Sequence, residues 1–119
     1  MGRGMAEDVV VMKNFFQTRE EALEDIKKTG FWPTTLVSPP TDALPLHWHE
    51  CEIHGYVIQG HTYVLVGREG RRVDIGPGDK LVLPPRSIHA EGESAEEVTY
   101  IVTLPDTRPL GEAIDLNLV

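Results

Sequence analysis

Residues 47–60 read HWHECEIHGYVIQG, and the rest of the chain is interpreted around them. His47 and His49 are two residues apart, so on a β-strand their side chains project from one face and two imidazole nitrogens can converge on a single point. Such a pair alone is more often two half-buried strand histidines than a metal site. A second segment, residues 76–88 (GPGDKLVLPPRSI), leads directly into a third histidine, His89. Histidines from two separate strand edges favour metal ligation.

Both segments resemble the two motifs of the cupin family, commonly written G-x5-H-x-H-x3,4-E-x6-G and G-x5-P-x-G-x2-H-x3-N. The matching positions are His47, His49 and Gly60 in the first motif and Gly78, Pro84 and His89 in the second. The resemblance covers about half of the chain by motif and most of the rest by its strand pattern. It implies a small single-domain cupin of the RmlC-like type, whose fold is an all-β double-stranded β-helix, or jelly-roll barrel.

Three positions depart from these motifs. Arg86 stands where the second motif has glycine, and Glu93 replaces its final asparagine. Counting back from Gly60 puts Ile53 in the position of the glutamate that cupins usually supply as a metal ligand. The third departure bears directly on the chemistry of the site.

Length and composition suit one compact domain. The chain has 119 residues, of which 40% are hydrophobic and 25% charged, enough for one core but not for two. We expect residues 1–8, which lack a periodic pattern, to be a flexible N-terminus and residues 9–119 to be a single cupin domain. The formal net charge of -8 opposes binding to nucleic acid or to an anionic membrane. A small molecule or another protein is therefore the expected partner.

The compartment is expected to be the cytoplasm. No apolar run approaches the roughly 18 residues of a membrane span, and residues 1–5 lack the apolar region of a secretory signal. Cys51 is the single cysteine, so an intramolecular disulfide is excluded and nothing indicates an oxidising environment.

One helix and a series of short strands are predicted. Thr18 and Glu21 form a capping box and Gly30 suits the stop, so the pattern predicts a short N-terminal helix over residues 19–29. From residue 44 onward, β-type runs punctuated by glycine and proline are typical of a barrel or sandwich. Their ranges are 46–48, 53–58, 62–66, 72–75, 80–83 and 98–104. Residues 9–12 form a further apolar run, predicted as an edge strand that pairs with a partner subunit; the family resemblance implies a homodimer.

We predict that His47, His49 and His89 bind one divalent transition metal. In a barrel of about eight strands the interior holds packed side chains or one small ligand, so inward-facing histidines from neighbouring strands would meet in a dry pocket. Imidazole nitrogens suit Fe, Zn, Ni or Cu better than Mg or Ca, which prefer oxygen ligands. The candidate metals are Fe, Zn, Ni, Mn and Cu. The identity of the metal does not follow from the sequence.

The sequence leaves two candidates for a fourth metal ligand. Glu52 and His54 flank Ile53, so strict strand alternation would turn both away from the metal and leave three histidines. A β-bulge that shifts the register by one would turn one of them inward. We favour His54, with Glu52 as the alternative that approaches the two-histidine, one-carboxylate arrangement of Fe(II) oxygenases.

The predicted activity follows from the charge of such a site. Three or four neutral histidines leave the metal's double positive charge in place, which favours an anionic bidentate substrate. Tyr56, Arg86 and Tyr100 are candidates to contact that substrate, and His61 is expected to be an exposed turn residue. We predict a transition-metal-dependent enzyme of the dioxygenase or isomerase type that acts on a small anionic metabolite. The alternatives are a non-catalytic binding or sensor cupin and a barrel whose histidines hold no metal, because fold alone does not choose.

Overall fold

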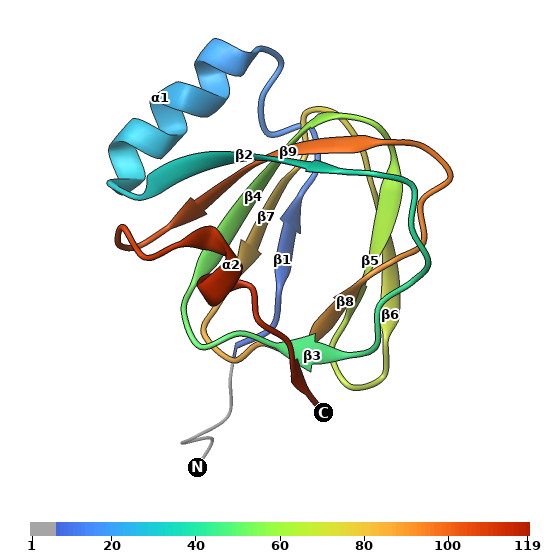
Figure 1. Ribbon diagram of the computed structural model, residues 1–119. Coiled ribbons are helices and arrows are strands. Elements are labelled where there is room, and N and C mark those ends of the chain that lie inside the picture. The colour runs from blue at the N-terminus through green and yellow to red at the C-terminus, as the bar shows by residue number, and fades with distance from the viewer. Residues whose placement is uncertain (1–6) are drawn as a thin grey trace.

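Two five-stranded antiparallel sheets face each other in the computed structural model of the protein, which describes residues 7–119 (Figure 1). The first sheet has the order β1-β7-β4-β9-β2, and its strands are β1 (Val10–Met12), β7 (Lys80–Leu83), β4 (Ile53–Gln59), β9 (Val98–Leu104) and β2 (Trp32–Ser38). The second has the order β10-β3-β8-β5-β6, with strands β10 (Asn117–Leu118), β3 (His47–Trp48), β8 (His89–Glu91), β5 (Thr62–Val66) and β6 (Arg71–Ile75). The predicted all-β jelly-roll architecture with a short N-terminal helix is confirmed.

The core lies between the two sheets. Its buried members come from both of them and are mainly branched aliphatic residues, including Ile53 and Val57 of β4 and Val64 of β5. Chain direction reverses at glycines with positive φ, among them the motif glycine Gly60, with φ of 92°. A Cβ there would run into the backbone carbonyl of Glu97, so this turn requires glycine.

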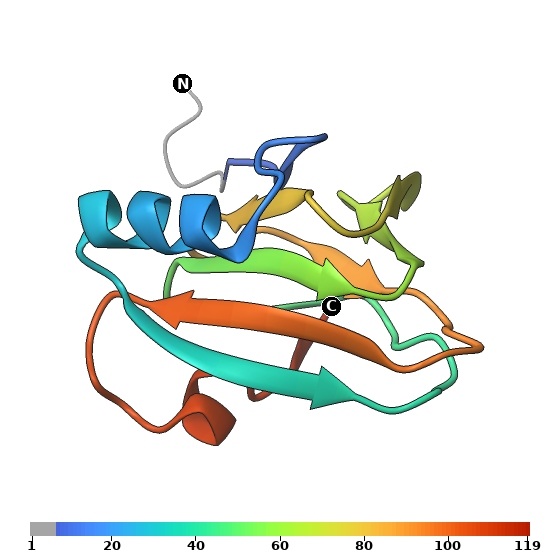
Figure 2. The same cartoon turned by 90° about the horizontal axis from the view of Figure 1, so that it is seen from above.

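Helix α1 (Arg19–Thr29) covers the outer face of the first sheet (Figure 2). Its limits are those predicted, because the Thr18 side chain accepts a hydrogen bond from the amide of Glu21 at 3.1 Å and Gly30 ends the helix in the left-handed conformation. Ala22 and Ile26 are buried and pack in a second core cluster with Tyr56 of β4 and Ile101 of β9. No helix within residues 7–119 is long and apolar enough to cross a bilayer.

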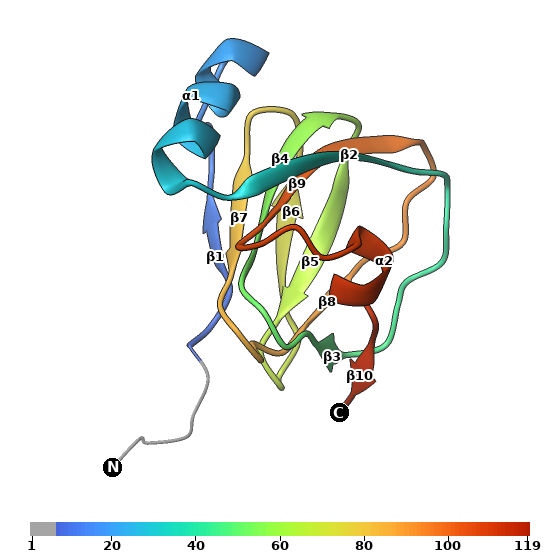
Figure 3. The ribbon, with the colours of Figure 1, turned by 60° about the vertical axis from the view of Figure 1, so that its left-hand side comes forward.

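The C-terminal segment folds back onto the second sheet (Figure 3). After the short helix α2 (Leu110–Ala113), β10 pairs with β3, where Asn117 lies opposite Trp48 and donates a side-chain hydrogen bond to its carbonyl at 3.0 Å. This segment closes the barrel beside the strand that carries the first two motif histidines.

The N-terminal predictions are met in part. β1 is an edge strand that pairs with β7, as its sequence indicated, whereas a partner subunit stays a prediction. Of the predicted flexible N-terminus, residues 1–6 lie outside the described part of the chain, and Glu7 and Asp8 are exposed. The strands of both sheets come from residues 10–118.

Candidate metal centre

Strand pairing brings His47, His49 and His89 together inside the barrel. His47 on β3 lies directly opposite His89 on β8, and His49 follows two residues after His47, on the same face of the chain. The three ring centroids are 4.5 to 5.1 Å apart, and one nitrogen from each ring can be chosen so that all lie within 4.8 Å of one another. All three residues are buried, with exposures of 0, 6 and 1%. The group could hold one metal ion.

Each imidazole is oriented by a backbone carbonyl. His47 donates from Nδ1 to the Pro45 carbonyl at 2.7 Å, and His89 donates from Nδ1 to the Ser87 carbonyl at 3.1 Å. His49 donates from Nδ1 to the carbonyl of Asp115 at 3.0 Å. A carbonyl oxygen can only accept, so each Nδ1 carries a proton, and in the neutral ring each Nε2 presents a lone pair. This tautomer is the one that metal-binding histidines adopt when a second partner fixes the ring.

The free nitrogens fit a cation. Nε2 of His47 and Nε2 of His89 are buried without a hydrogen-bond partner among the described residues. A buried polar atom that lacks a partner costs free energy, and a shared metal ion would satisfy both atoms at once. Burial, followed by the proximity of His89, lowers the pKa of His49, which keeps that ring neutral and available as a ligand.

A cavity of about 360 Å³ adjoins the histidines within the barrel. His49 and Glu91 belong to its wall, and most of the remaining wall is apolar, including Ile53, Val64 and Val102. No lysine or arginine is among the described residues that line this cavity. The space accepts a small and largely apolar molecule next to the candidate metal centre.

The two predicted fourth ligands lie elsewhere. β4 alternates strictly at this point: Ile53 faces the core, while the His54 ring stacks on Phe31 at 4.5 Å and lies 2.6 Å from a carboxylate oxygen of Glu52. The irregularity in the pairing of β4 and β9 falls between Val57 and Gln59, too late to turn either residue inward. The structure therefore does not bring His54 or Glu52 to the three histidines.

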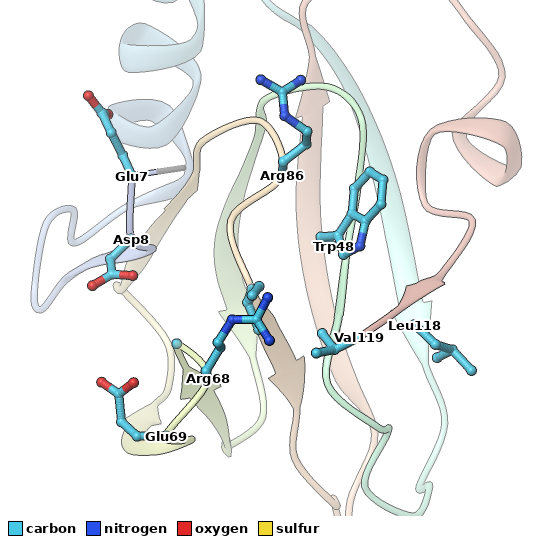
Figure 4. Close-up of a pocket in the computed structure, with 10 residues that line it drawn as sticks. Glu7, Asp8, Trp48, Arg68, Glu69, Arg86, Leu118 and Val119 are labelled. Atoms are coloured by element: carbon cyan, nitrogen blue, oxygen red, sulfur yellow. The ribbon is translucent and has the colours of Figure 1, made fainter. Parts of the chain in front are cut away.

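The predicted substrate-contact residues separate as well. Tyr100 lines the cavity, and burial, then the charge of Glu91, raises its pKa to about 12, so its hydroxyl stays a hydrogen-bond donor. Tyr56 is fully buried under α1 and donates to Asp25. Arg86 is exposed and, together with Arg68 and Trp48, lines a different pocket at the surface (Figure 4). Of the three, only Tyr100 reaches the cavity.

Sequence reasoning missed Glu91, whose carboxylate contacts two of the three histidines. Its Oε1 lies 3.3 Å from Nε2 of His47 and its Oε2 lies 3.2 Å from Nε2 of His89. The signal was available, because Glu91 follows His89 by two residues and the same strand rule that paired His47 with His49 applies to it.

The family of the protein follows from its sequence as well as from this geometry. Residues 35–103, more than half of the chain, match the cupin domain family. The chain belongs to the cupin family. Cupins commonly bind a transition metal, and the three histidines form a group that could hold one.

Known proteins similar to the chain include enzymes. It is 31% identical over 80 residues to 3-hydroxyanthranilate 3,4-dioxygenase of Cupriavidus pinatubonensis, an alignment that covers 66% of this chain and 42% of that enzyme. The chain thus spans less than half the length of this curated relative.

Solved structures share the fold at low identity. The polyketide cyclase RemF from Streptomyces resistomycificus matches with a TM-score of 0.57 at 22% identity, over 75% of this chain and 60% of that one. A DUF861 family protein from Thermotoga maritima matches with a TM-score of 0.57 at 16% identity, over 81% of this chain and 98% of that one.

Proposed function

We propose that this cupin is a transition-metal-dependent enzyme of the dioxygenase or isomerase type, with His47, His49 and His89 as metal ligands. One observation carries the proposal: each of the three rings uses its Nδ1 to bond a backbone carbonyl and leaves its Nε2 as the ligand atom, and the Nε2 atoms of His47 and His89 are buried without a hydrogen-bond partner among the described residues. Three such nitrogens are an arrangement that a divalent transition metal stabilises and that a plain apolar core does not need. The metal, when bound, would supply Lewis acidity and, as Fe(II), a site for O2.

The chain's own residues would bind and enclose the substrate. The apolar wall of the 360 Å³ cavity would desolvate a molecule of a few ring or chain atoms, and the Tyr100 hydroxyl would donate a hydrogen bond to one of its oxygens. The described residues that line the cavity include no lysine or arginine. The metal ion would therefore have to neutralise any negative charge on the substrate. A compact enolate or diketone suits this cavity better than a molecule with a remote carboxylate.

The likeness to a dioxygenase supports the same reaction class. The alignment with 3-hydroxyanthranilate 3,4-dioxygenase covers two thirds of this chain, enough to raise the expectation of O2 chemistry but not to transfer the substrate. The other finer expectations, a homodimer and a cytoplasmic location, belong to the same proposal. Exposed apolar residues on the edge strands, Val10, Trp32 and Val37, support the first, and a free, buried Cys51 is compatible with the second.

The test begins with the metal and then turns to oxygen. Protein purified without a histidine tag is analysed for Fe, Zn, Ni, Mn and Cu, and one metal per chain is expected. Oxygen uptake is then measured with the Fe(II)-loaded protein and a panel of diketones, 2-oxo acids and catechols. Uptake that depends on one compound class supports a dioxygenase.

Two outcomes speak against an enzyme or against the metal. If the protein binds metal but turns over no compound, measured by O2 uptake and by NMR for isomerisation, the binding or sensor alternative is favoured. A metal content near zero after growth in metal-supplemented medium would refute the proposal.

A further inference from the structure

Glu91 occupies a position that the cupin motifs do not assign. It follows His89 by two residues on β8, so both side chains leave the strand on the same face. One carboxylate oxygen lies 3.3 Å from Nε2 of His47, and the other lies 3.2 Å from Nε2 of His89. The carboxylate therefore spans the two buried nitrogens that lack a hydrogen-bond partner.

This contact requires a cation. An ionised carboxylate has no proton to donate, and the two histidines have their protons on Nδ1, so lone pairs face lone pairs across the gap. Either a proton on an imidazole or a metal ion has to lie between them. Two ligand atoms bound side by side to one transition metal at about 2.0–2.2 Å are about 3.0–3.6 Å apart. The two measured separations fall in that range.

The glutamate that the first cupin motif usually supplies as a metal ligand is replaced in this chain. Ile53, in the position of the first-motif glutamate, is 5% exposed and belongs to the apolar core. Glu52 points to His54 on the opposite face of β4. Among the described residues that line the cavity, Glu91 is the single acidic side chain.

We propose that Glu91 is the fourth protein ligand of the metal, delivered by β8 in place of the first-motif glutamate. The inference deepens the proposed function and rests on its three-histidine site. Its consequence is electrostatic: the carboxylate neutralises one of the two positive charges of the metal. The Glu91 side chain lines the cavity, so this ligand would lie beside the space where a substrate would bind.

The test compares Glu91→Gln with Glu93→Gln. Both changes remove one negative charge from the same stretch of chain, but Glu93 is exposed and makes no contact with the histidines among the described interactions. Zn(II) and Co(II) affinities are measured by competition with a chromophoric chelator, and the visible spectrum of the Co(II) form reports the ligand set directly. Circular dichroism checks that each variant is folded.

We expect Glu91→Gln to weaken metal binding by about 100-fold and to change the Co(II) spectrum, since loss of an outer partner of a ligand alone costs about 10–100-fold. Glu93→Gln should do neither. An unchanged affinity and spectrum in Glu91→Gln would overturn this inference while leaving the three-histidine proposal in place. A wild-type protein that binds neither metal would overturn both, and Glu91 would then be paired with protonated histidine. If Glu91→Gln does not fold, Glu91→Asp replaces it, with an altered Co(II) spectrum expected and an unaltered one counting against the ligand.

Discussion

The backbone carbonyl of Asp115 lies 3.0 Å from Nδ1 of His49. The segment between α2 and β10 therefore orients a side chain that stands 66 residues earlier in the sequence. His47 and His89 take their carbonyl partners from two residues away in their own segments, at Pro45 and Ser87. His49 alone depends on a distant part of the chain. The C-terminal segment is therefore a positioning element for the candidate metal centre as well as a closing strand.

Deletion of residues 115–119 tests this dependence. The deletion removes the carbonyl that fixes His49 and the pairing of β10 with β3, so we expect metal affinity to fall about 10–100-fold while the remaining strands stay paired. Asp115→Ala is the matched control, because it keeps the carbonyl and should bind metal like the wild type. Chelator competition measures both. Equal affinities for the deletion and the wild type would show that the tail does not position His49.

His49→Ala tests the ligand itself. The variant loses one ligand nitrogen and leaves one carbonyl without a partner, so we expect metal retention to be lost at a stability cost of about 1 kcal/mol. His61→Ala is the control, since His61 is exposed, as predicted, and its side chain pairs with Glu96 at the surface. Elemental analysis and thermal melting of both variants check the result. Full metal content in His49→Ala would mean that the ligand set is wrong.

Much of this arrangement was readable from the sequence. The helix over residues 19–29 and the strands over 62–66, 80–83 and 98–104 have the predicted limits, because capping residues, glycine turns and prolines mark most of their ends. The three motif histidines converge as strand periodicity required. Family motifs and local patterns therefore predicted the barrel and the group of three histidines that could hold a metal ion.

The parts that were missed have physical reasons. β2 contains Pro33, which argues against a central strand, but β2 lies at the sheet edge, where a missing amide is tolerated. The Asp115 contact uses a backbone carbonyl, a group that every residue has, so no residue type marks it. For His54 the sequence left two registers open, and only the pairing of β4 with its neighbours decides between them.

Metal binding should also raise thermal stability. An ion that binds the folded chain and not the unfolded one stabilises it by about 4 kcal/mol when present at 1,000 times its Kd. For a domain of this size that corresponds to an increase in Tm of more than about 10 °C. Melting is followed with chelator-treated protein before and after addition of Zn(II). The increase should be absent in His49→Ala, and an increase of equal size there would point to binding at another site.

Ile53→Glu returns a carboxylate to the position where the cupin motif has one. Ile53 is buried in the apolar core, so a charged side chain there should destabilise the metal-free protein by about 3 kcal/mol. In the Glu91→Gln background, the new carboxylate should restore part of the lost metal affinity. Ile53→Gln in the same background is the control and should restore none. Chelator competition and urea unfolding measure the two effects, and equal affinities for the Glu and Gln variants would contradict the prediction.

The group of Lys80, Asp25 and Tyr56 under α1 should make the free energy of unfolding fall at acid pH. Asp25 accepts hydrogen bonds from both Lys80 and Tyr56 at 2.5 Å, and the Lys80 side chain is only 7% exposed. Burial favours the neutral acid, but the hydrogen bonds from Lys80 and Tyr56 outweigh it, so the pKa of Asp25 lies below its usual value.

A carboxyl whose pKa is lower in the folded than in the unfolded chain stabilises the fold above its unfolded pKa of about 3.9, and this contribution is lost as the pH falls through the folded value. We therefore expect the free energy of unfolding to fall below about pH 4, and Asp25→Asn to reduce that fall. At neutral pH, Asp25→Asn should destabilise the protein by about 3 kcal/mol, because the Lys80 ammonium loses its charged partner. Tyr56→Phe removes one neutral donor and should cost about 1 kcal/mol. Urea unfolding of the three proteins at pH 3 and pH 7 measures these differences, and an Asp25→Asn variant as stable as the wild type at pH 7 would show that Lys80 does not depend on Asp25.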